Sequence, residues 1–133
     1  MSDNNNPNKN VLVIEDEPII AHVCSRILAL DGYDASIADS GETALDMFTK
    51  KEYDVYICDI KMPGMSGIEF YNFIKKDYPD RINRLIMITG DLLSSETREF
   101  LRDINIPYIL KPFTPDELRE AIDKLKSNPS ATN

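Results

Sequence analysis

The sequence predicts an α/β fold, a doubly wound five-stranded parallel sheet with helices on both faces. Short apolar runs of strand length alternate with longer segments whose apolar residues recur at helical spacing, and this pair of patterns occurs five times in 133 residues. Such repetition is typical of a parallel sheet covered by helices on each side. Four of the apolar runs also end in polar residues, and parallel strands bring their carboxyl ends to one edge, where ligands bind.

The first half of the chain holds two such units. An apolar strand at 11–14 precedes a helix that Gly32 ends, and a shorter strand follows at 33–38. A second helix is expected from about Ser40. The residues expected to face the core are Ile20, Val23, Cys24, Ile27 and Leu28 in the first helix, and Ala44, Leu45 and Phe48 in the second.

The central unit contains the strand at 55–58, which leads into Asp59. The helix after it is expected to begin at Ser66, because Ser66 and Glu69 have the spacing of a capping box. The apolar face of this helix consists of Ile68, Phe70, Phe73 and Ile74.

Two further units complete the predicted sheet. The strand at 85–88 precedes a helix that opens at Ser94 or Ser95. The strand at 108–110 precedes the last helix, whose start is marked by the threonine, proline and glutamate of 114–117. The expected core residues of these two helices are Phe100, Leu101, Leu118, Ala121, Ile122 and Leu125.

Composition and sequence boundaries indicate one domain over 10–126, with polar tails at 1–9 and 127–133. The net charge of −8 repels phosphate backbones, and no basic stripe offsets it, so nucleic acid is excluded as a partner. The sequence shows no signal peptide and no long apolar run. These features predict a cytoplasmic protein without a membrane partner.

Three carboxylates are expected to meet at the carboxyl edge of the sheet. Glu15 and Asp16 end the first strand, and Asp59 ends a neighbouring one. Two acids after a strand can form a solvated turn, but three converging carboxylates repel one another unless a cation lies between them. Mg²⁺ suits oxygen ligands and keeps several waters, so Asp16 and Asp59 are expected to bind it directly and Glu15 through water.

Thr89 and Lys111 bring a hydroxyl and an ammonium to the same edge, at the ends of two other strands. Beside acids, Lys111 can neutralise their charge and hold a phosphoryl oxygen, although a lysine before proline is also an ordinary turn residue. Pro112 allows a cis peptide bond, which would fix the direction of the ammonium. Thr89 can donate a hydrogen bond to a phosphoryl group, and Gly90 lets the backbone approach closely.

These motifs occur in a characteristic order along the chain. They are Glu15-Asp16, the run Asp59-Ile60-Lys61-Met62-Pro63-Gly64-Met65-Ser66-Gly67, then Thr89-Gly90, Tyr108 and Lys111-Pro112. The ordered set resembles the receiver domain of two-component response regulators over residues 10–126. The resemblance implies the flavodoxin-like strand order 2-1-3-4-5. The first acid is glutamate where many members have aspartate, and both occur in the family, so the expected metal site stands.

The resemblance also implies residue roles. Asp59 would be the phosphoacceptor and would receive the phosphoryl group from a phosphohistidine on a sensor histidine kinase or histidine phosphotransfer protein. The backbone carbonyl of Lys61 would bind Mg²⁺. Thr89 and Tyr108 occupy the positions of a switch that reshapes the face of the fourth helix, last strand and last helix for a downstream protein. Tyr108 as a half-buried aromatic without a switching role is the alternative.

A further implied role concerns the lifetime of the phosphoryl group. In such domains the side chains at the positions of Lys61 and Asp91 flank the path of the water that hydrolyses the acyl phosphate. Their opposite charges predict an ion pair across the mouth of the site, which would act as a lifetime gate. The alternative is two solvated charges that never meet.

Other readings of the same residues stay open. Such a domain catalyses only its own phosphorylation and dephosphorylation, so it is not an ordinary enzyme. A degenerate receiver that serves as a binding scaffold is disfavoured because every expected site residue is present. An aspartate-nucleophile phosphatase is disfavoured because Lys61 stands where such enzymes have their second catalytic aspartate. His22, the one histidine, is expected on the polar side of the first helix and not as a phosphodonor. The chain is either a stand-alone receiver or a receiver segment of a larger protein such as a hybrid histidine kinase.

Overall fold

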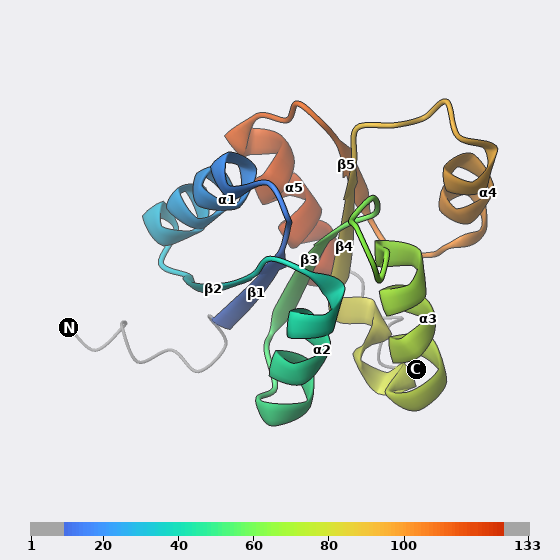
Figure 1. Ribbon diagram of the computed structural model, residues 1–133. Coiled ribbons are helices and arrows are strands. Elements are labelled where there is room, and N and C mark those ends of the chain that lie inside the picture. The colour runs from blue at the N-terminus through green and yellow to red at the C-terminus, as the bar shows by residue number, and fades with distance from the viewer. Residues whose placement is uncertain (1–9, 127–133) are drawn as a thin grey trace.

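The computed structural model describes residues 10–126, and the tails expected at 1–9 and 127–133 lie outside the described residues. Five parallel strands form one sheet in the order β2-β1-β3-β4-β5 (Figure 1). The strands are β1 (Asn10–Ile14), β2 (Asp34–Ala38), β3 (Val55–Asp59), β4 (Leu85–Thr89) and β5 (Tyr108–Leu110). The predicted fold class and strand order are confirmed.

Each expected helix is present, and side-chain caps fix most of the starts. The helices are α1 (Pro18–Leu30), α2 (Gly41–Lys50), α3 (Gly67–Asp77), α4 (Ser95–Asp103) and α5 (Pro115–Lys126). Ser40, Ser66 and Ser94 cap α2, α3 and α4, and Ser66 forms the complete capping box. Thr114 and Glu117 exchange the same pair of bonds at the start of α5. Within residues 10–126, none of these helices is both long and apolar enough to cross a membrane.

The three central strands, β1, β3 and β4, are buried on both faces, and alternate strand residues point to opposite layers. Val11 and Val13 pack with α1 and α5 on one face, whereas Leu12 and Ile14 pack with α2, α3 and α4 on the other. Figure 1 shows the same two groups of helices on opposite sides of the sheet. The expectation that Val23 is in the core is wrong: Val23 is 43% exposed, because the buried stripe of α1 runs through Ala21, Cys24, Ile27 and Leu28.

The segment Pro79–Arg84 forms a 3₁₀ helix, η2, that the sequence did not predict. It has six residues and none of them is buried, so it is too short to show an apolar helical period. Arg81 lies over the ring of Phe48 at 4.9 Å, and Arg84 pairs with Glu52 at 2.7 Å. These contacts tie η2 to the end of α2, at the edge of the sheet where β4 begins.

Candidate functional site

Glu15 follows β1 and is a buried carboxylate, 1% exposed. Its Oε2 accepts a hydrogen bond from the Glu17 amide at 3.1 Å. Its Oε1 lies 3.1 Å from Lys111 Nζ but has no aligned hydrogen-bond donor among the described residues. Burial, and then the negative charge of Asp59, raise the pKa of Glu15 to about 7, against the opposing effects of the Glu17 amide and Lys111. The buried oxygen therefore favours a proton or a cation beside it.

Asp59 ends β3, between β1 and β4, and is 3% exposed. Its Oδ2 accepts a hydrogen bond from Lys111 Nζ at 3.0 Å, and its Oδ1 accepts a longer one from the Lys61 amide at 3.4 Å. Gly67 packs directly against the Asp59 backbone, because a Cβ at that glycine would collide with the Asp59 carbonyl oxygen. The strand and the first turn of α3 thus hold this carboxylate in place at the carboxyl edge.

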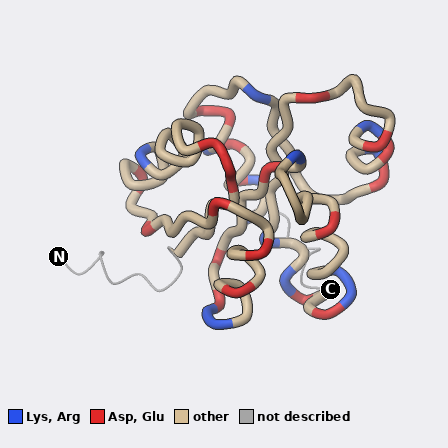
Figure 2. The backbone as a smooth tube through the Cα atoms, in the orientation of Figure 1, with Lys and Arg blue, Asp and Glu red and all other residues tan. Residues whose placement is uncertain are grey.

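Lys111 directly follows β5, and its ammonium lies among three carboxylates. The Nζ is 2.8 Å from Glu17 Oε1, 3.0 Å from Asp59 Oδ2 and 3.1 Å from Glu15 Oε1. Burial disfavours the charged ammonium, but the hydrogen bonds to Glu17 and Asp59 and the nearby Glu15 carboxylate outweigh that effect and raise the pKa of Lys111. The peptide bond between Lys111 and Pro112 is cis. Figure 2 shows the acidic chain segment where β1 runs into α1.

The carboxylates that converge differ from the predicted set in one member. Glu15, Glu17 and Asp59 each offer an oxygen, and the three oxygens lie within 4.8 Å of one another, whereas Asp16 is outside this group and partly exposed. The chain leaves β1 after Ile14 and bends at Asp16, and the acids on either side of the bend, Glu15 and Glu17, both reach Lys111. Glu17 is not among the residues that the sequence predicted for this site. The spacing of Glu15 and Glu17 in the run of three acids was the available signal.

The donor atoms fit a hard divalent cation. Carboxylate oxygens are the ligands that Mg²⁺ prefers, and Glu15 Oε1 is a buried acceptor without an aligned donor among residues 10–126. Glu15, Glu17 and Asp59 can contribute ligands in the geometry seen. Asp16, which the sequence predicted as a direct ligand, directly follows Glu15 in the chain.

Thr89 ends β4 and is fully buried. Its Oγ1 accepts a hydrogen bond from the Asp91 amide at 3.1 Å, so the hydroxyl is bound within its own loop. The side chain of Asp91 lies 3.1 Å from Lys61 Nζ, which is the ion pair that the sequence suggested between the two loops. A Cβ at Gly90 would lie 3.4 Å from Lys111 Cβ, which is an ordinary contact distance, so Gly90 borders the lysine side chain.

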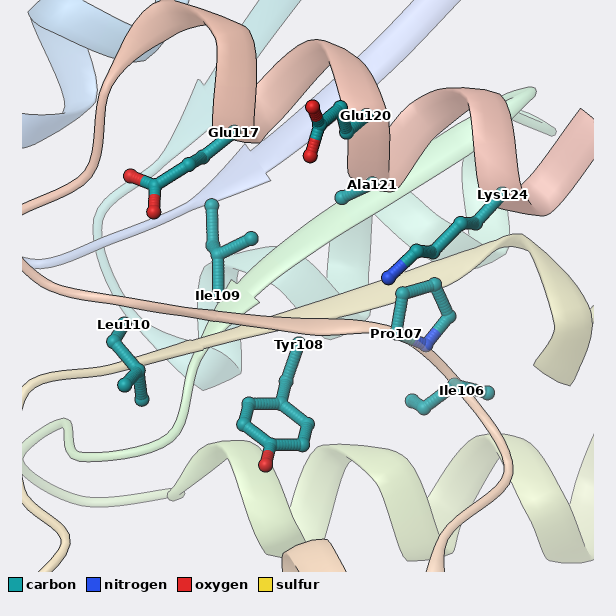
Figure 3. A pocket seen from close by; sticks show the side chains of 9 residues that line it. All are labelled: Ile106, Pro107, Tyr108, Ile109, Leu110, Glu117, Glu120, Ala121 and Lys124. Atoms are coloured by element: carbon teal, nitrogen blue, oxygen red, sulfur yellow. The ribbon is translucent and has the colours of Figure 1, made fainter.

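Tyr108 begins β5 and is 45% exposed. Figure 3 shows its ring on the side of β5 away from α5. A hollow of about 480 Å³ between β5 and α5 includes Tyr108, Leu110 and Glu120, and a second of about 300 Å³ joins Tyr108 to Leu92 and Arg102. The structure therefore has an indented surface that runs from α4 across β5 to α5, with Tyr108 in both hollows.

Comparison with known proteins connects the fold and this site to one family. The family model described as response regulator receiver domain matches residues 11–123. The heme response regulator HssR of Staphylococcus aureus is 34% identical over 117 residues, which is 87% of this chain and 49% of HssR. The chain thus spans about half the length of that relative. The chemotaxis protein CheY-3 of Vibrio cholerae is 31% identical, over 90% of this chain and 93% of CheY-3.

Solved structures give the same assignment. The response regulator TrrA of Thermotoga maritima, in complex with Mg²⁺ and BeF, has a TM-score of 0.74 and 36% identity, and the match covers 88% of this chain and 98% of TrrA. A CheY-like receiver domain protein of Methanospirillum hungatei has a TM-score of 0.80 and 31% identity, with 92% and 97% covered. This chain belongs to the response regulator receiver domain family.

Proposed function

We propose that this receiver domain accepts a phosphoryl group on Asp59 from a phosphohistidine, in a reaction that depends on Mg²⁺. The donor would be a sensor histidine kinase or a histidine phosphotransfer protein in the cytoplasm. The observation that carries the proposal is the Asp59 carboxylate itself, buried at the meeting point of the strand ends with Lys111 at 3.0 Å. The Mg²⁺ and BeF in the TrrA structure support a metal in this chain as well.

The transfer needs a nucleophile and fixed positive charge. One oxygen of Asp59 attacks the phosphorus, the P–N bond breaks, and the histidine leaves with the electron pair and takes up a proton. Lys111 holds a phosphoryl oxygen as a point charge, and the Thr89 hydroxyl, which donates to the Asp91 carbonyl at 3.4 Å, turns to donate to another phosphoryl oxygen. Glu15, Asp16, Asp59 and the Lys61 carbonyl would hold Mg²⁺, which when bound offsets the negative charge of the phosphoryl oxygens.

The output would be a change in the surface formed by α4, β5 and α5. Movement of the Thr89 hydroxyl toward the phosphoryl group pulls on the loop after β4, and Tyr108 lies on the next strand, where β5 pairs with β4. An exposed Tyr108 has room to turn inward, and the two hollows beside it would then change shape. A downstream protein that binds this face would register the change.

Acetyl phosphate with Mg²⁺, followed by intact-protein mass measurement, separates the candidate functions. A receiver gains one labile phosphoryl group per chain. A phosphatase turns over the phosphate without retaining it, and a binding scaffold does neither. Either of the last two results would overturn the proposal.

Asp16→Ala tests the expected direct metal ligand. Loss of an outer-shell partner weakens metal binding about 10–100-fold. Loss of a direct ligand should weaken Mg²⁺ binding by more than this, and phosphorylation should fall with it. Tyrosine fluorescence can report the titration, because the chain has no tryptophan. Asp39→Ala is the matched control, an exposed acid directly after β2 at the same edge. Equal affinities in both variants would place the ion elsewhere.

A further inference from the structure

Lys111 has more carboxylate partners than its proposed task requires. Its ammonium donates to Glu17 Oε1 at 2.8 Å and to Asp59 Oδ2 at 3.0 Å, and Glu15 Oε1 lies 3.1 Å away without an aligned hydrogen bond. A phosphoryl oxygen that approaches Lys111 competes with these carboxylates for the ammonium, so Lys111 gives up contact with one of them. Which carboxylate it releases depends on the cost of leaving that carboxylate unpaired.

The three partners differ in that cost. Glu15 and Asp59 are almost fully buried, and a buried carboxylate that loses its partner keeps an uncompensated charge away from water. The Glu17 side chain is 60% exposed, so water can replace the ammonium at little cost. Glu17 is therefore the partner that Lys111 can release most easily, although it forms the shortest of the three contacts.

The backbone of Glu17 is fixed independently of its side chain. Its amide donates to Glu15 Oε2 at 3.1 Å, and its carbonyl accepts from the Ala21 amide at 3.0 Å in the first turn of α1. The residue is extended at the N-cap of α1, with Pro18 after it. A change of the Glu17 carboxylate should thus leave the chain path and the position of Glu15 as they are.

From this geometry we infer that Glu17 is a positioning residue that acts through Lys111, and the inference rests on the proposed function. Before phosphorylation it holds the ammonium beside Asp59, and during transfer a phosphoryl oxygen takes its place on Lys111. Glu17 therefore competes with the phosphoryl group for the lysine. Its charge restrains phosphorylation and shortens the life of the phosphorylated form.

The test compares Glu17→Gln with wild type at saturating Mg²⁺, with acetyl phosphate as donor. The variant should take up the phosphoryl group about two- to fivefold faster, the range expected for release of one exposed ion pair. Glu17→Asp, which keeps the charge, should restore most of the wild-type rate. Asp39→Asn removes the same charge from the end of β2 and controls for weaker repulsion of the anionic donor.

Two further measurements separate a role through Lys111 from a general effect. In a Lys111→Ala background, Glu17→Gln should change the rate no more than Asp39→Asn does, because the coupling needs both partners. In metal-free protein, the side-chain nitrogen resonance of Lys111 should shift in Glu17→Gln and not in Asp39→Asn.

The outcomes distinguish this inference from the proposed function. Wild-type protein that gains no phosphoryl group overturns both. Two results overturn the role of Glu17 alone, if wild type does gain the phosphoryl group. One is a phosphorylation rate of Glu17→Gln equal to that of Asp39→Asn. The other is that Glu17→Gln accelerates phosphorylation as much in the Lys111→Ala background as in wild type.

Discussion

At the scale of single residues, the site concentrates negative charge that the fold only partly compensates. Glu15, Glu17 and Asp59 share one ammonium, and two of these carboxylates are buried. Burial and the negative charge of Asp59 make the charged form of Glu15 unfavourable and raise its pKa. The metal-free protein therefore carries an electrostatic cost at this site, and a divalent cation would remove it.

This cost predicts a pH dependence of stability in the metal-free protein. The pKa of Glu15 is about 7 in the fold against an ordinary 4.5, so the folded state binds more protons between these values. The contribution of Glu15 is then fully present below pH 4.5 and is lost as pH rises through 7. The expected loss is on the order of 1–3 kcal/mol, visible as a falling Tm in circular dichroism. Saturating Mg²⁺ should reduce the slope, since it favours the deprotonated carboxylate.

Glu15→Gln is the control for this prediction. The amide cannot titrate, so the decline in Tm over this pH range should be smaller in metal-free Glu15→Gln than in wild type. The same slope in both proteins would assign the pH dependence to other groups.

The ion pair of Lys61 and Asp91 leads to a kinetic prediction. Both side chains are substantially exposed, 61% and 35%, so solvent screens the pair and it contributes little to stability. It lies between the loops after β3 and β4 and should instead screen or orient the water that attacks phosphorylated Asp59. Lys61→Ala is expected to change the phosphoryl lifetime several-fold with nearly unchanged unfolding. A wild-type lifetime in both Lys61→Ala and Asp91→Ala would exclude a gate.

At the scale of helices and strands, the features that the sequence predicted were those marked by a periodic pattern of apolar residues or by a local helix cap. The strands β1, β3, β4 and β5 consist mainly of apolar runs, and Ser66 with Glu69 forms a capping box that involves no distant residue. Leu45 and Phe100, expected in the core, are only partly buried, because the exact boundary of a helical stripe depends on neighbouring elements. The contacts of η2 with α2 are long-range in sequence and leave no short pattern.

The site shows the same difference between features that the sequence pattern predicts and features that depend on local packing. Strand order brought Glu15, Asp59 and Lys111 to one edge, and the arrangement of strand ends was enough to predict that. The direction of each side chain at that edge was not predictable from strand order. Glu17 was missed, and Asp16 lies outside the converging group, because the chain bends at Asp16 and this local path decides which acids face Lys111. The outward position of Tyr108 likewise depends on packing around β5.

The contact between β3 and α3 predicts that a side chain at position 67 destabilises the fold. A Cβ there would collide with the Asp59 carbonyl oxygen, and backbone cannot move aside as a flexible side chain can. Gly67→Ala should lower the free energy of unfolding by about 1–3 kcal/mol and slow phosphorylation, since the strain falls on Asp59. Gly90→Ala, with its nearest neighbour at 3.4 Å, should cost less in a denaturant titration. Equal stability of Gly67→Ala and wild type would show that α3 can shift freely.

At the scale of the whole molecule, the sheet joins the site to a separate surface. The parallel strands end at one edge, where the acids and Lys111 lie, and β4 and β5 continue into the face with α4 and α5 (Figure 1). The surface is acidic overall, with a net charge of −8, and Figure 2 shows acidic segments distributed over several elements. This charge disfavours nucleic acid as a direct partner and leaves proteins as the proposed ones.

The most direct test of the account is the mass of the intact protein after acetyl phosphate and Mg²⁺, compared between wild type and Asp59→Asn. Asparagine keeps the side-chain volume but removes the nucleophilic oxygen pair and one carboxylate charge. Wild type should gain the mass of one phosphoryl group, and Asp59→Asn should gain none while its circular dichroism stays that of the folded protein. Equal, stoichiometric labelling of the two proteins would contradict the assignment of Asp59 as the phosphoacceptor.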